Sequence, residues 1–564
     1  MIRLLVLAVF VSGLQAQVPG VSSTTTASAV NSSQPPAPAI KPEDKCKITG
    51  SVLSAGSDAP LRKADVLLTP LQHADTENPY GATTDGSGQF SIENIDPGQY
   101  RLSATRNGFV RGSYGDRGNP HSMGETLTLT NGQTMKNLTI KLVPQGVITG
   151  RITDEDGDSL PYVGVQCMLY TWVKGKRQLM ASGVAMTNDL GEYRIFDLVP
   201  GKYFIKATYQ DRYSWQLAPK GKAEEGYAPE YYPNASDASN AAVVPITPGA
   251  QIHGIDMTLQ KMHTVRVEGH VLSAATGKPV RNAYVMLFSK NNGGYVSMGT
   301  SVADASGKFT LHGVVPGSYI LNAGRQSMND RESYRQPLDV GTSNIENMDV
   351  SLSSGAAIKG SIIVETPGDI KGSNVRVFLR PKQDNPMGGA ASETIQDDGS
   401  FTVENVTPNI YDVTVYGLPE GYYVKSIHLG DVDATNGPLD ISQGISGGEF
   451  KIIVSPNGAQ VEGDVHDDKD KAATGVKVVL VPDSDHRTQT SLFNMTATDQ
   501  NGHFKIKGIT PGKYKLFAWE SIEPGQYEDP DFLKSVESFG TPVEFEESAH
   551  ATQALKLLPA PPDE

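Results

Sequence analysis

The sequence predicts an all-β protein of five tandem, seven-stranded antiparallel β-sandwich domains of the Ig-like type. Two short phrases recur five times at a constant spacing. Around them apolar and polar residues alternate as on half-buried strands, with turn signals roughly every 8–12 residues. No stretch shows a convincing helical period. The 58 glycines and 36 prolines among 564 residues fit the same turn-rich class.

The longer phrase is Asp-x-x-Gly-x-aromatic-x-apolar-x-x-apolar-x-Pro-Gly-x-Tyr. A shorter phrase, apolar-x-Gly-x-apolar, precedes each copy by about 40 residues. The fourth copy is degraded, because Asn409 replaces the second glycine. A repeat period of about 90–120 residues is the size of a domain, so each copy should have its own core. The copies of the longer phrase begin at Asp85, Asn188, Asp304, Gln396 and Asp499.

The fixed residues of the longer phrase have expected folding roles, which the first copy illustrates. Asp85 can accept backbone hydrogen bonds that start a tight turn, and Gly88 supplies the positive φ of that turn. The aromatic and apolar positions should enter the core. Pro97 and Gly98 suit the centre of a type II turn. Tyr100 can bury its ring while its hydroxyl reaches a backbone or water partner.

Taken together, ITGSV, DGSGQF and PGQY resemble the carboxypeptidase regulatory-like domain. This resemblance implies a transthyretin-like sandwich, grouped with carbohydrate-binding-like folds, of the kind carried by bacterial secreted multi-domain proteins. It extends over about residues 46–558. It is specific for fold and not for function, because such domains occur in many unrelated proteins.

The two ends of the chain lie outside the repeats. Arg3 and the apolar run from Leu4 to Val11 indicate a secretion signal, and the run is too short to cross a bilayer. We therefore expect a secreted or periplasmic protein without membrane insertion. The expected segments are a signal peptide (1–16), a disordered Ser/Thr/Pro-rich tether (17–45), five sandwiches (46–143, 144–262, 263–354, 355–456 and 457–558) and a tail (559–564).

Several kinds of chemistry are not indicated by the sequence. The formal net charge of −15 argues against nucleic acid as a partner. Metallopeptidase, CxxC and GxSxG motifs are absent, so we expect no enzyme activity, no catalytic residues and no cofactor. Asp154, Asp156 and Asp158 alternate in a polar turn that is either solvated or a structural calcium site. Cys46 and Cys167 are expected on early strands of different domains, so a disulfide between them would need an inter-domain contact.

The strongest candidate for ligand binding is an aromatic cluster in the second repeat. The rings could stack on sugars or anchor a protein partner, or they could pack the loop onto its own sandwich. Residues 209–232 contain the six candidates Tyr209, Tyr213, Trp215, Tyr227, Tyr231 and Tyr232.

The leading hypothesis is a non-catalytic array that binds polysaccharide or a cell-envelope protein through loops at the sandwich ends. The alternative is an accessory subunit of an envelope peptidase or an outer-membrane transporter.

Overall fold

The computed structural model describes eleven stretches of the chain. They are residues 41–71, 79–116, 124–209, 225–290, 297–326, 331–366, 368–370, 374–382, 390–392, 395–444 and 447–561. Nearly all regular structure in them is β, as the sequence predicts.

The first sandwich has two facing sheets, ordered β4-β1-β8 and β3-β2-β5-β6, with β7 also on β5. β1 pairs antiparallel with β4 and parallel with β8. The parallel pair arises because the last strand returns beside the first after the chain has crossed the other sheet. The elements are η1 (Pro42–Asp44), β1 (Cys46–Ser54), β2 (Asp65–Pro70), β3 (Tyr80–Thr83), β4 (Gln89–Ile95), β5 (Gly98–Thr105), β6 (Gly112–Ser113), β7 (Thr126–Leu129) and β8 (Thr134–Leu142).

The second sandwich repeats this plan with orders β12-β9-β17 and β11-β10-β13-β15; β18 also pairs with β9, and β16 with β13. Its β10–β11 hairpin is long, and β14 and β19 form a separate pair. The elements are β9 (Gly146–Asp154), β10 (Val163–Val173), β11 (Lys176–Met186), β12 (Glu192–Leu198), β13 (Gly201–Tyr209), β14 (Glu225–Tyr227), β15 (Glu230–Tyr231), η3 (Ala238–Asn240), β16 (Val244–Ile246), β17 (Gln251–Ile252), β18 (Met257–Leu259) and β19 (Lys261–His263).

In the third sandwich one seven-stranded sheet, ordered β22-β21-β24-β25-β26-β20-β23, wraps both layers. The fourth has the orders β30-β27-β35-β32-β33 and β29-β28-β31-β34. The third contains β20 (Val265–Ser273), β21 (Tyr284–Ser289), β22 (Ser297–Val302), β23 (Lys308–Val314), β24 (Gly317–Gln326), β25 (Arg331–Val340) and β26 (Ile345–Ser354). The fourth contains β27 (Ala356–Val364), β28 (Arg376–Pro381), β29 (Ala390–Ala391), β30 (Ser400–Val406), β31 (Ile410–Tyr416), β32 (Tyr423–Leu429), β33 (Val432–Asp433), β34 (Leu439–Asp440) and β35 (Phe450–Ser455).

The fifth sandwich, ordered β38-β37-β40-β42-β36-β39 with β41 on β40, carries the one α-helix among the described residues. The side chain of Asp529 caps α1 by accepting from the amides of Asp531 and Phe532, and Leu533 is buried. A seven-residue helix is too short to show a period in the sequence. The elements are β36 (Ala459–His466), β37 (Lys477–Pro482), η4 (Ser484–His486), η5 (Thr490–Leu492), β38 (Asn494–Ala497), β39 (His503–Ile509), β40 (Gly512–Trp519), η6 (Gln526–Glu528), α1 (Pro530–Val536), η7 (Glu537–Phe539), β41 (Thr541–Phe545) and β42 (His550–Leu558).

Five main clusters of buried apolar residues lie between these sheets, one in each sandwich. A smaller cluster under α1 contains Phe517 and Trp519, whose rings stack with centroids 4.9 Å apart. The exact boundaries between the domains stay a prediction.

The tyrosine of the longer phrase makes the same hydrogen bond in every sandwich. Its hydroxyl donates to the carbonyl oxygen four residues earlier, at 2.6–2.8 Å, so the buried ring has a satisfied polar tip. This confirms the expected role. The pairs are Tyr100–Asp96, Tyr203–Val199, Tyr319–Val315, Tyr411–Thr407 and Tyr514–Thr510.

The turn that opens the phrase also forms as expected, but the Pro-Gly step does not. Asp85 Oδ1 accepts from the amides of Ser87 and Gln89, and Gly88 has φ +73°. Gly98 lies in β5 without a positive φ, so the expected type II turn is wrong. The left-handed residue is instead Asn94, with φ +59°, at a bulge where the β1–β4 register shifts. The other copies place Asp197, Gly313, Asn405 and Gly508 there, all left-handed.

The glycine of the shorter phrase is required by a close approach of two strands. A Cβ at Gly50 would lie 2.1 Å from the carbonyl oxygen of Leu138, and one at Gly463 would lie 1.7 Å from that of Gln553. Real Cβ atoms do not come this close to a backbone oxygen. Only glycine therefore lets the first strand lie against the parallel last strand.

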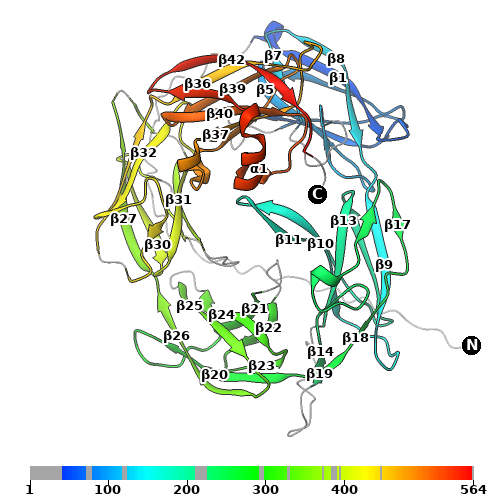
Figure 1. Ribbon diagram of the computed structural model, residues 1–564, viewed down its shortest axis with the longest axis vertical. Coiled ribbons are helices and arrows are strands. Elements are labelled where there is room, and N and C mark those ends of the chain that lie inside the picture. Colours follow the sequence, from blue (N-terminus) through cyan, green and yellow to red (C-terminus); the bar gives the residue numbers. More distant parts are fainter. Residues whose placement is uncertain are drawn as a thin grey trace, which may run out of the picture.

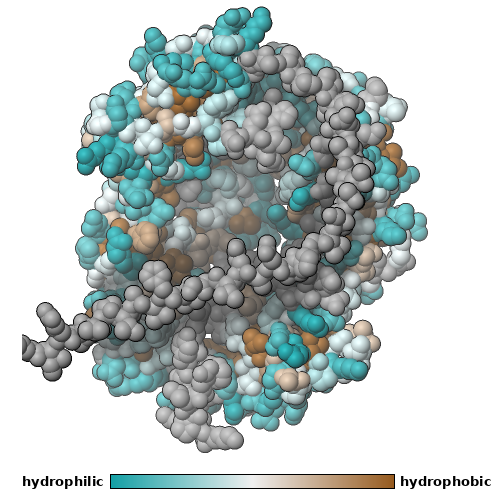
Figure 2. Space-filling model, turned by 180° about the vertical axis from the view of Figure 1, so that it is seen from behind, coloured by the Kyte–Doolittle hydropathy of each residue, from teal (hydrophilic) through white to brown (hydrophobic). Residues whose placement is uncertain are grey.

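The five sandwiches follow one another around a ring, so the first lies beside the fifth (Figure 1). A β-bridge between Thr126 and Asp499 joins them. The β10–β11 hairpin and α1 both point toward the middle of the ring, and Lys174 in the hairpin turn forms a 2.6 Å ion pair with Asp412 of the fourth sandwich. Seen from behind, hydrophilic residues dominate the described rim (Figure 2).

Candidate functional site

The described members of the aromatic cluster pack onto their own sandwich. Tyr231 is 6 % exposed, and its ring centre lies 5.2 Å from the ammonium nitrogen of Lys206. Tyr209 and Tyr227 meet edge to face with centroids 4.9 Å apart. The amide of Tyr232 donates to the carbonyl oxygen of Ile205. The ring contacts of Tyr209, Tyr227 and Tyr231 give these residues packing roles, and ligand binding by the cluster stays a prediction.

Tyr213 and Trp215, the two other candidates, lie outside the described residues.

The carboxylates considered for calcium face a lysine. Asp154 Oδ1 accepts from the amides of Asp156 and Asp158, which closes the turn. The ammonium nitrogen of Lys261 lies 2.5 Å from Asp156 Oδ2 and 3.3 Å from Asp154 Oδ2. Hydrogen bonds to the carboxylates of Asp156 and Asp154 raise the pKa of Lys261. In the part of the chain that the structure describes, no three His, Cys, Asp or Glu side chains are grouped to hold a metal.

Both cysteines are buried free thiols. Cys46 Sγ lies 3.1 Å from the carbonyl oxygen of Thr130, to which it donates. Burial raises the pKa of Cys167 to about 12, so this thiol stays protonated at neutral pH.

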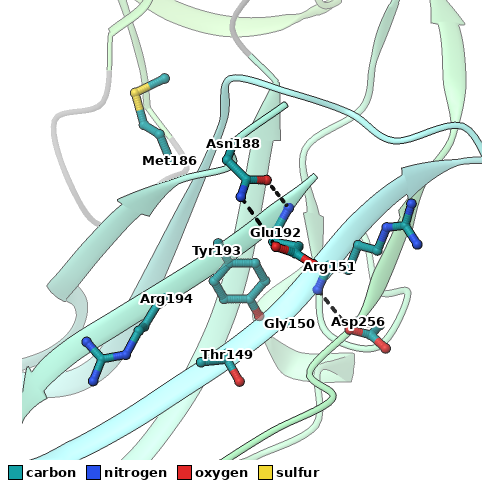
Figure 3. Close-up of a pocket in the computed structure, with 9 residues that line it drawn as sticks. All are labelled: Thr149, Gly150, Arg151, Met186, Asn188, Glu192, Tyr193, Arg194 and Asp256. Atoms are coloured by element: carbon teal, nitrogen blue, oxygen red, sulfur yellow. Dashed lines mark hydrogen bonds between the residues drawn. The ribbon is translucent and has the colours of Figure 1, made fainter. Parts of the chain in front are cut away.

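A polar groove lies elsewhere on the second sandwich, over the outer face of the sheet formed by β9 and β12 (Figure 3). This open groove has a volume of about 570 Å³. The pairing of Thr149 with Arg194 and of Arg151 with Glu192 puts these four side chains on one face of the two strands. The full lining is Thr149, Gly150, Arg151, Met186, Asn188, Glu192, Tyr193, Arg194 and Asp256.

Each wall of the groove is held by backbone contacts. Asn188 Oδ1 accepts from the amides of Leu190 and Glu192 and shapes the turn before β12. The amide of Arg151 donates to Asp256 Oδ1 at 2.8 Å. The hydroxyl of the buried Tyr193 donates to the carbonyl oxygen of Ile255 at 2.7 Å. The groove is therefore formed by the fold and not by mobile loops.

The two guanidinium groups of the groove have no carboxylate partner among the described residues. Arg151 donates through Nε to the carbonyl oxygen of Leu190 and through Nη2 to the hydroxyl of Ser159. Arg194 lies over the ring of Phe196, 5.5 Å from its centre. Figure 3 shows the two arginine side chains pointing toward opposite ends of the groove.

The same face of other sandwiches is crossed by ion pairs instead. In the fifth, Lys505 holds the position of Arg194 and pairs with Glu462 at 2.7 Å. In the first, Lys47 pairs with Glu93 at 2.5 Å. In the second sandwich Thr149 takes the place of Glu462. The loss of this carboxylate leaves Arg194 available to an external group.

Exposed apolar side chains also gather on this sandwich. Leu190 is 54 % exposed and Phe196 is 58 % exposed. The other copies of the phrase place Ser, Ser, Asp and Asn at the position of Leu190, and Glu, His, Glu and Lys at that of Phe196. The fixed positions of the phrase do not reveal these residues, because Leu190 and Phe196 both lie at variable positions. Comparing the variable positions would have shown that the second copy is the exception.

The groove can donate from guanidinium and amide groups and accept at two carboxylates, next to an exposed aromatic ring. This combination suits recognition of a ligand with many hydroxyl groups, because planar polar side chains match pairs of hydroxyls.

Residues 47–143 and 266–353, the first and third sandwiches, match the family model of the carboxypeptidase regulatory-like domain. The first and third sandwiches are thus carboxypeptidase regulatory-like domains. Residues 457–524 match the second beta sandwich domain of BOS complex subunit NOMO1-like proteins. The resemblance seen in the motifs is confirmed, and the regulatory-like domains supply the sandwiches on either side of the groove-bearing one.

Two curated proteins are similar to long parts of the chain. Serine-aspartate repeat-containing protein F of Staphylococcus epidermidis is 24 % identical over an alignment of 270 residues, which covers 42 % of this chain and 16 % of the relative. Colossin-A of Dictyostelium discoideum is 23 % identical over an alignment of 381 residues, which covers 59 % of this chain and 3 % of the relative. The chain thus spans a small part of each relative's length.

Solved structures of pilins also align with the chain. A streptococcal ancillary pilin aligns with 54 % of this chain and 99 % of its own, at 14 % identity and a TM-score of 0.16. A minor pilin of Streptococcus agalactiae aligns with 39 % of this chain and 97 % of its own, at 15 % identity and a TM-score of 0.21. Scores this low do not bear on the arrangement of the sandwiches or on function.

In the described residues, no helix has the length and apolar character needed to cross a membrane.

Proposed function

We propose that this protein is a non-catalytic, secreted or periplasmic scaffold that binds polysaccharide in the groove of its second sandwich. The observation that carries the proposal is a pair of guanidinium groups, those of Arg151 and Arg194, in one groove. The carboxylates of Glu192 and Asp256 line the same groove, and among the described residues neither arginine forms an ion pair. Charged groups that are not neutralised within the protein keep their hydrogen-bonding capacity for a ligand.

The groove also suits sugars in shape. Its floor is the backbone of two paired strands, so the ligand meets a rigid surface and little ordering entropy is lost on binding. Phe196, which contacts the lining residue Arg194, has an exposed ring on which the apolar face of a sugar can lie. The remaining sandwiches act in this proposal as the frame that presents the groove.

The test is binding of the full mature chain to a glycan array, followed by calorimetry with the best ligand. Arg194→Ala should weaken binding by about tenfold or more, because a hydrogen bond to a charged group contributes roughly 1.5–3 kcal/mol. Lys505→Ala is the matched control, since Lys505 occupies the same position in the fifth sandwich and is paired with Glu462. Absence of any glycan ligand, or equal losses in both variants, would refute the proposal.

A protein partner is the second candidate, favoured by the exposed apolar side chains of Leu190 and Phe196 near the groove. Capture from envelope extracts by the native chain but not by a Leu190→Ser/Phe196→Glu variant, with no glycan bound, would support this candidate. The two replacements are the residues found at these positions in the first repeat.

A further inference from the structure

The contact between the first and fifth sandwiches is built around a glycine that stands where other repeats have side chains. Gly475 lies between β36 and β37 of the fifth sandwich, with φ +65°. Its amide donates to the carbonyl oxygen of Thr498. Lys63, Tyr162 and Asn282 make the equivalent bond in the first three sandwiches, and all three are left-handed. The backbone conformation at this position therefore tolerates a side chain.

The reason for glycine in the fifth repeat lies in the first sandwich. A Cβ at Gly475 would lie 2.7 Å from Cγ of Glu125 and 2.9 Å from the carbonyl oxygen of Gly115. Glu125 is 6 % exposed, and its side chain also fills the space beside Gly115, where a Cβ would lie 2.2 Å from the same Cγ. One glutamate thus sits between two glycines that belong to opposite ends of the repeat array.

A second residue of the fifth repeat completes the contact. The side-chain amide of Gln500 bonds to both backbone groups of Thr128: it accepts from the amide and donates to the carbonyl oxygen, each at 3.4 Å. Beside it, Thr126 and Asp499 form a parallel β-bridge. Gln500 occupies a variable position of the longer phrase, where the other copies have Gly86, Asp189, Ala305 and Asp397. None of those side chains could make this two-point contact.

The β10–β11 hairpin meets the same sandwich from inside the ring. A Cβ at Gly175 would lie 2.4 Å from the carbonyl oxygen of Glu528, and one at Gly525 would lie 2.9 Å from that of Trp172. Both glycines are left-handed. Backbone therefore lies directly against backbone where the hairpin reaches the segment before α1.

We infer that the first and fifth sandwiches form a specific interface, so that the chain is a closed ring rather than a string of independent domains. The partner that fits the surface of Glu125, Thr126 and Thr128 is the fifth sandwich of the same chain. The intervening sandwiches hold the two surfaces at high effective concentration, which favours closure within one chain over pairing between copies.

The test compares two variants of the full mature chain. Gly475→Asn adds a side chain that the left-handed backbone accepts, as Asn282 shows in the third sandwich. Gly277→Asn is the matched control: Gly277 has the same φ of +65°, and a Cβ there would meet nothing within 4 Å. Small-angle X-ray scattering should give a larger radius of gyration and maximum dimension for Gly475→Asn, with the control unchanged.

A second variant tests the same interface without adding bulk. Gln500→Ala removes the protein partner of the Thr128 amide, so hydrogen exchange at residues 126–129 should become faster while the core strands of both sandwiches stay protected. Circular dichroism and thermal unfolding of each variant establish that the sandwiches remain folded.

Two results would overturn the inference. The first is that Gly475→Asn and Gln500→Ala both give the same X-ray scattering and the same hydrogen exchange at Thr128 as the control Gly277→Asn. The other is a native mass that rises with protein concentration together with loss of Thr128 protection on dilution, which would place the contact between copies of the chain.

Discussion

The ammonium nitrogen of Lys206 lies 5.2 Å from the centre of the Tyr231 ring, and Lys206 is only 1 % exposed. Burial lowers the pKa of Lys206 to about 8. The attraction between the ammonium group and the aromatic ring favours the charged form of Lys206. The loss of hydration on burial disfavours the charged form more strongly, so the pKa falls.

This burial predicts a pH-dependent stability. The pKa of Lys206 is about 8 in the folded chain and 10.5 in the unfolded chain, so between these values the unfolded state binds more protons and stability rises with pH. The contribution is about 2–4 kcal/mol across that window. Lys206→Met lacks the buried ammonium. Its stability advantage in thermal unfolding should therefore be largest at pH 7 and shrink by pH 10. An advantage independent of pH would contradict this prediction.

The repeated tyrosine hydroxyl should contribute equally in different sandwiches. Tyr203→Phe removes the 2.7 Å hydrogen bond to Val199, and Tyr514→Phe removes the 2.8 Å bond to Thr510. Each change removes the hydroxyl donor of a partly buried hydrogen bond, and each should cost about 1–2 kcal/mol in denaturant unfolding. Tyr416→Phe, at a half-exposed ring, serves as control and should cost less than half as much.

Gly463→Ala should unfold the fifth sandwich. The new Cβ would lie 1.7 Å from the carbonyl oxygen of Gln553, so β36 and β42 must separate. Loss of a central strand pair costs several kcal/mol, a large part of the stability of one domain. Limited proteolysis should cleave this sandwich first. Gly86→Ala, where a Cβ meets nothing within 4 Å, should leave the pattern unchanged; cleavage of both variants alike would contradict the assignment.

The joint between the fourth and fifth sandwiches should loosen in acid. Lys425 bridges Glu365 and Glu547, and the hydroxyl of Tyr423 donates to Glu547. The hydrogen bonds from Lys425 and Tyr423 hold the pKa of Glu547 below its usual value. At pH values above the ordinary pKa range of carboxylates, these contacts therefore hold the joint. They are lost as the pH falls through the lowered pKa of Glu547.

Hydrogen exchange at residues 420–425, measured down to pH 3, should report this loss. Glu547→Gln should show fast exchange already at pH 7. If the native chain and this variant exchanged alike at pH 7, the carboxylate would not be what holds the joint.

The fold could be predicted from the sequence where a residue's role is local. The Asp85 turn and the left-handed Gly88 depend on backbone geometry within a few residues, so the motif predicts both. The left-handed Asn94 was missed for a different reason. The five copies have Asn, Asp or Gly at this position, so the shared left-handed conformation does not show as one residue type in the sequence.

The candidate site was harder to predict, because it depends on which residues stand opposite each other across strands. Within the part of the chain that the structure describes, Arg194 has no carboxylate partner, since Thr149 rather than a glutamate faces it on β9. The pairing of Thr149 with Arg194 follows from the register of β9 and β12. The two residues are 45 positions apart, so the sequence alone does not show that they face each other. The aromatic cluster, which composition singled out, packs largely against its own sandwich.

By itself the sequence determined five repeats, their strands and the tight turns, since the alternation of apolar residues and the turn chemistry act over short distances. Only the tertiary structure decided that the repeats curve into a ring, that Glu125 sits against Gly475 and that Arg194 faces an open groove. The ring and the Glu125–Gly475 contact depend on surfaces that meet across hundreds of residues and are fixed by the packing of whole domains. The groove depends on strand register within one sandwich, which no local preference encodes.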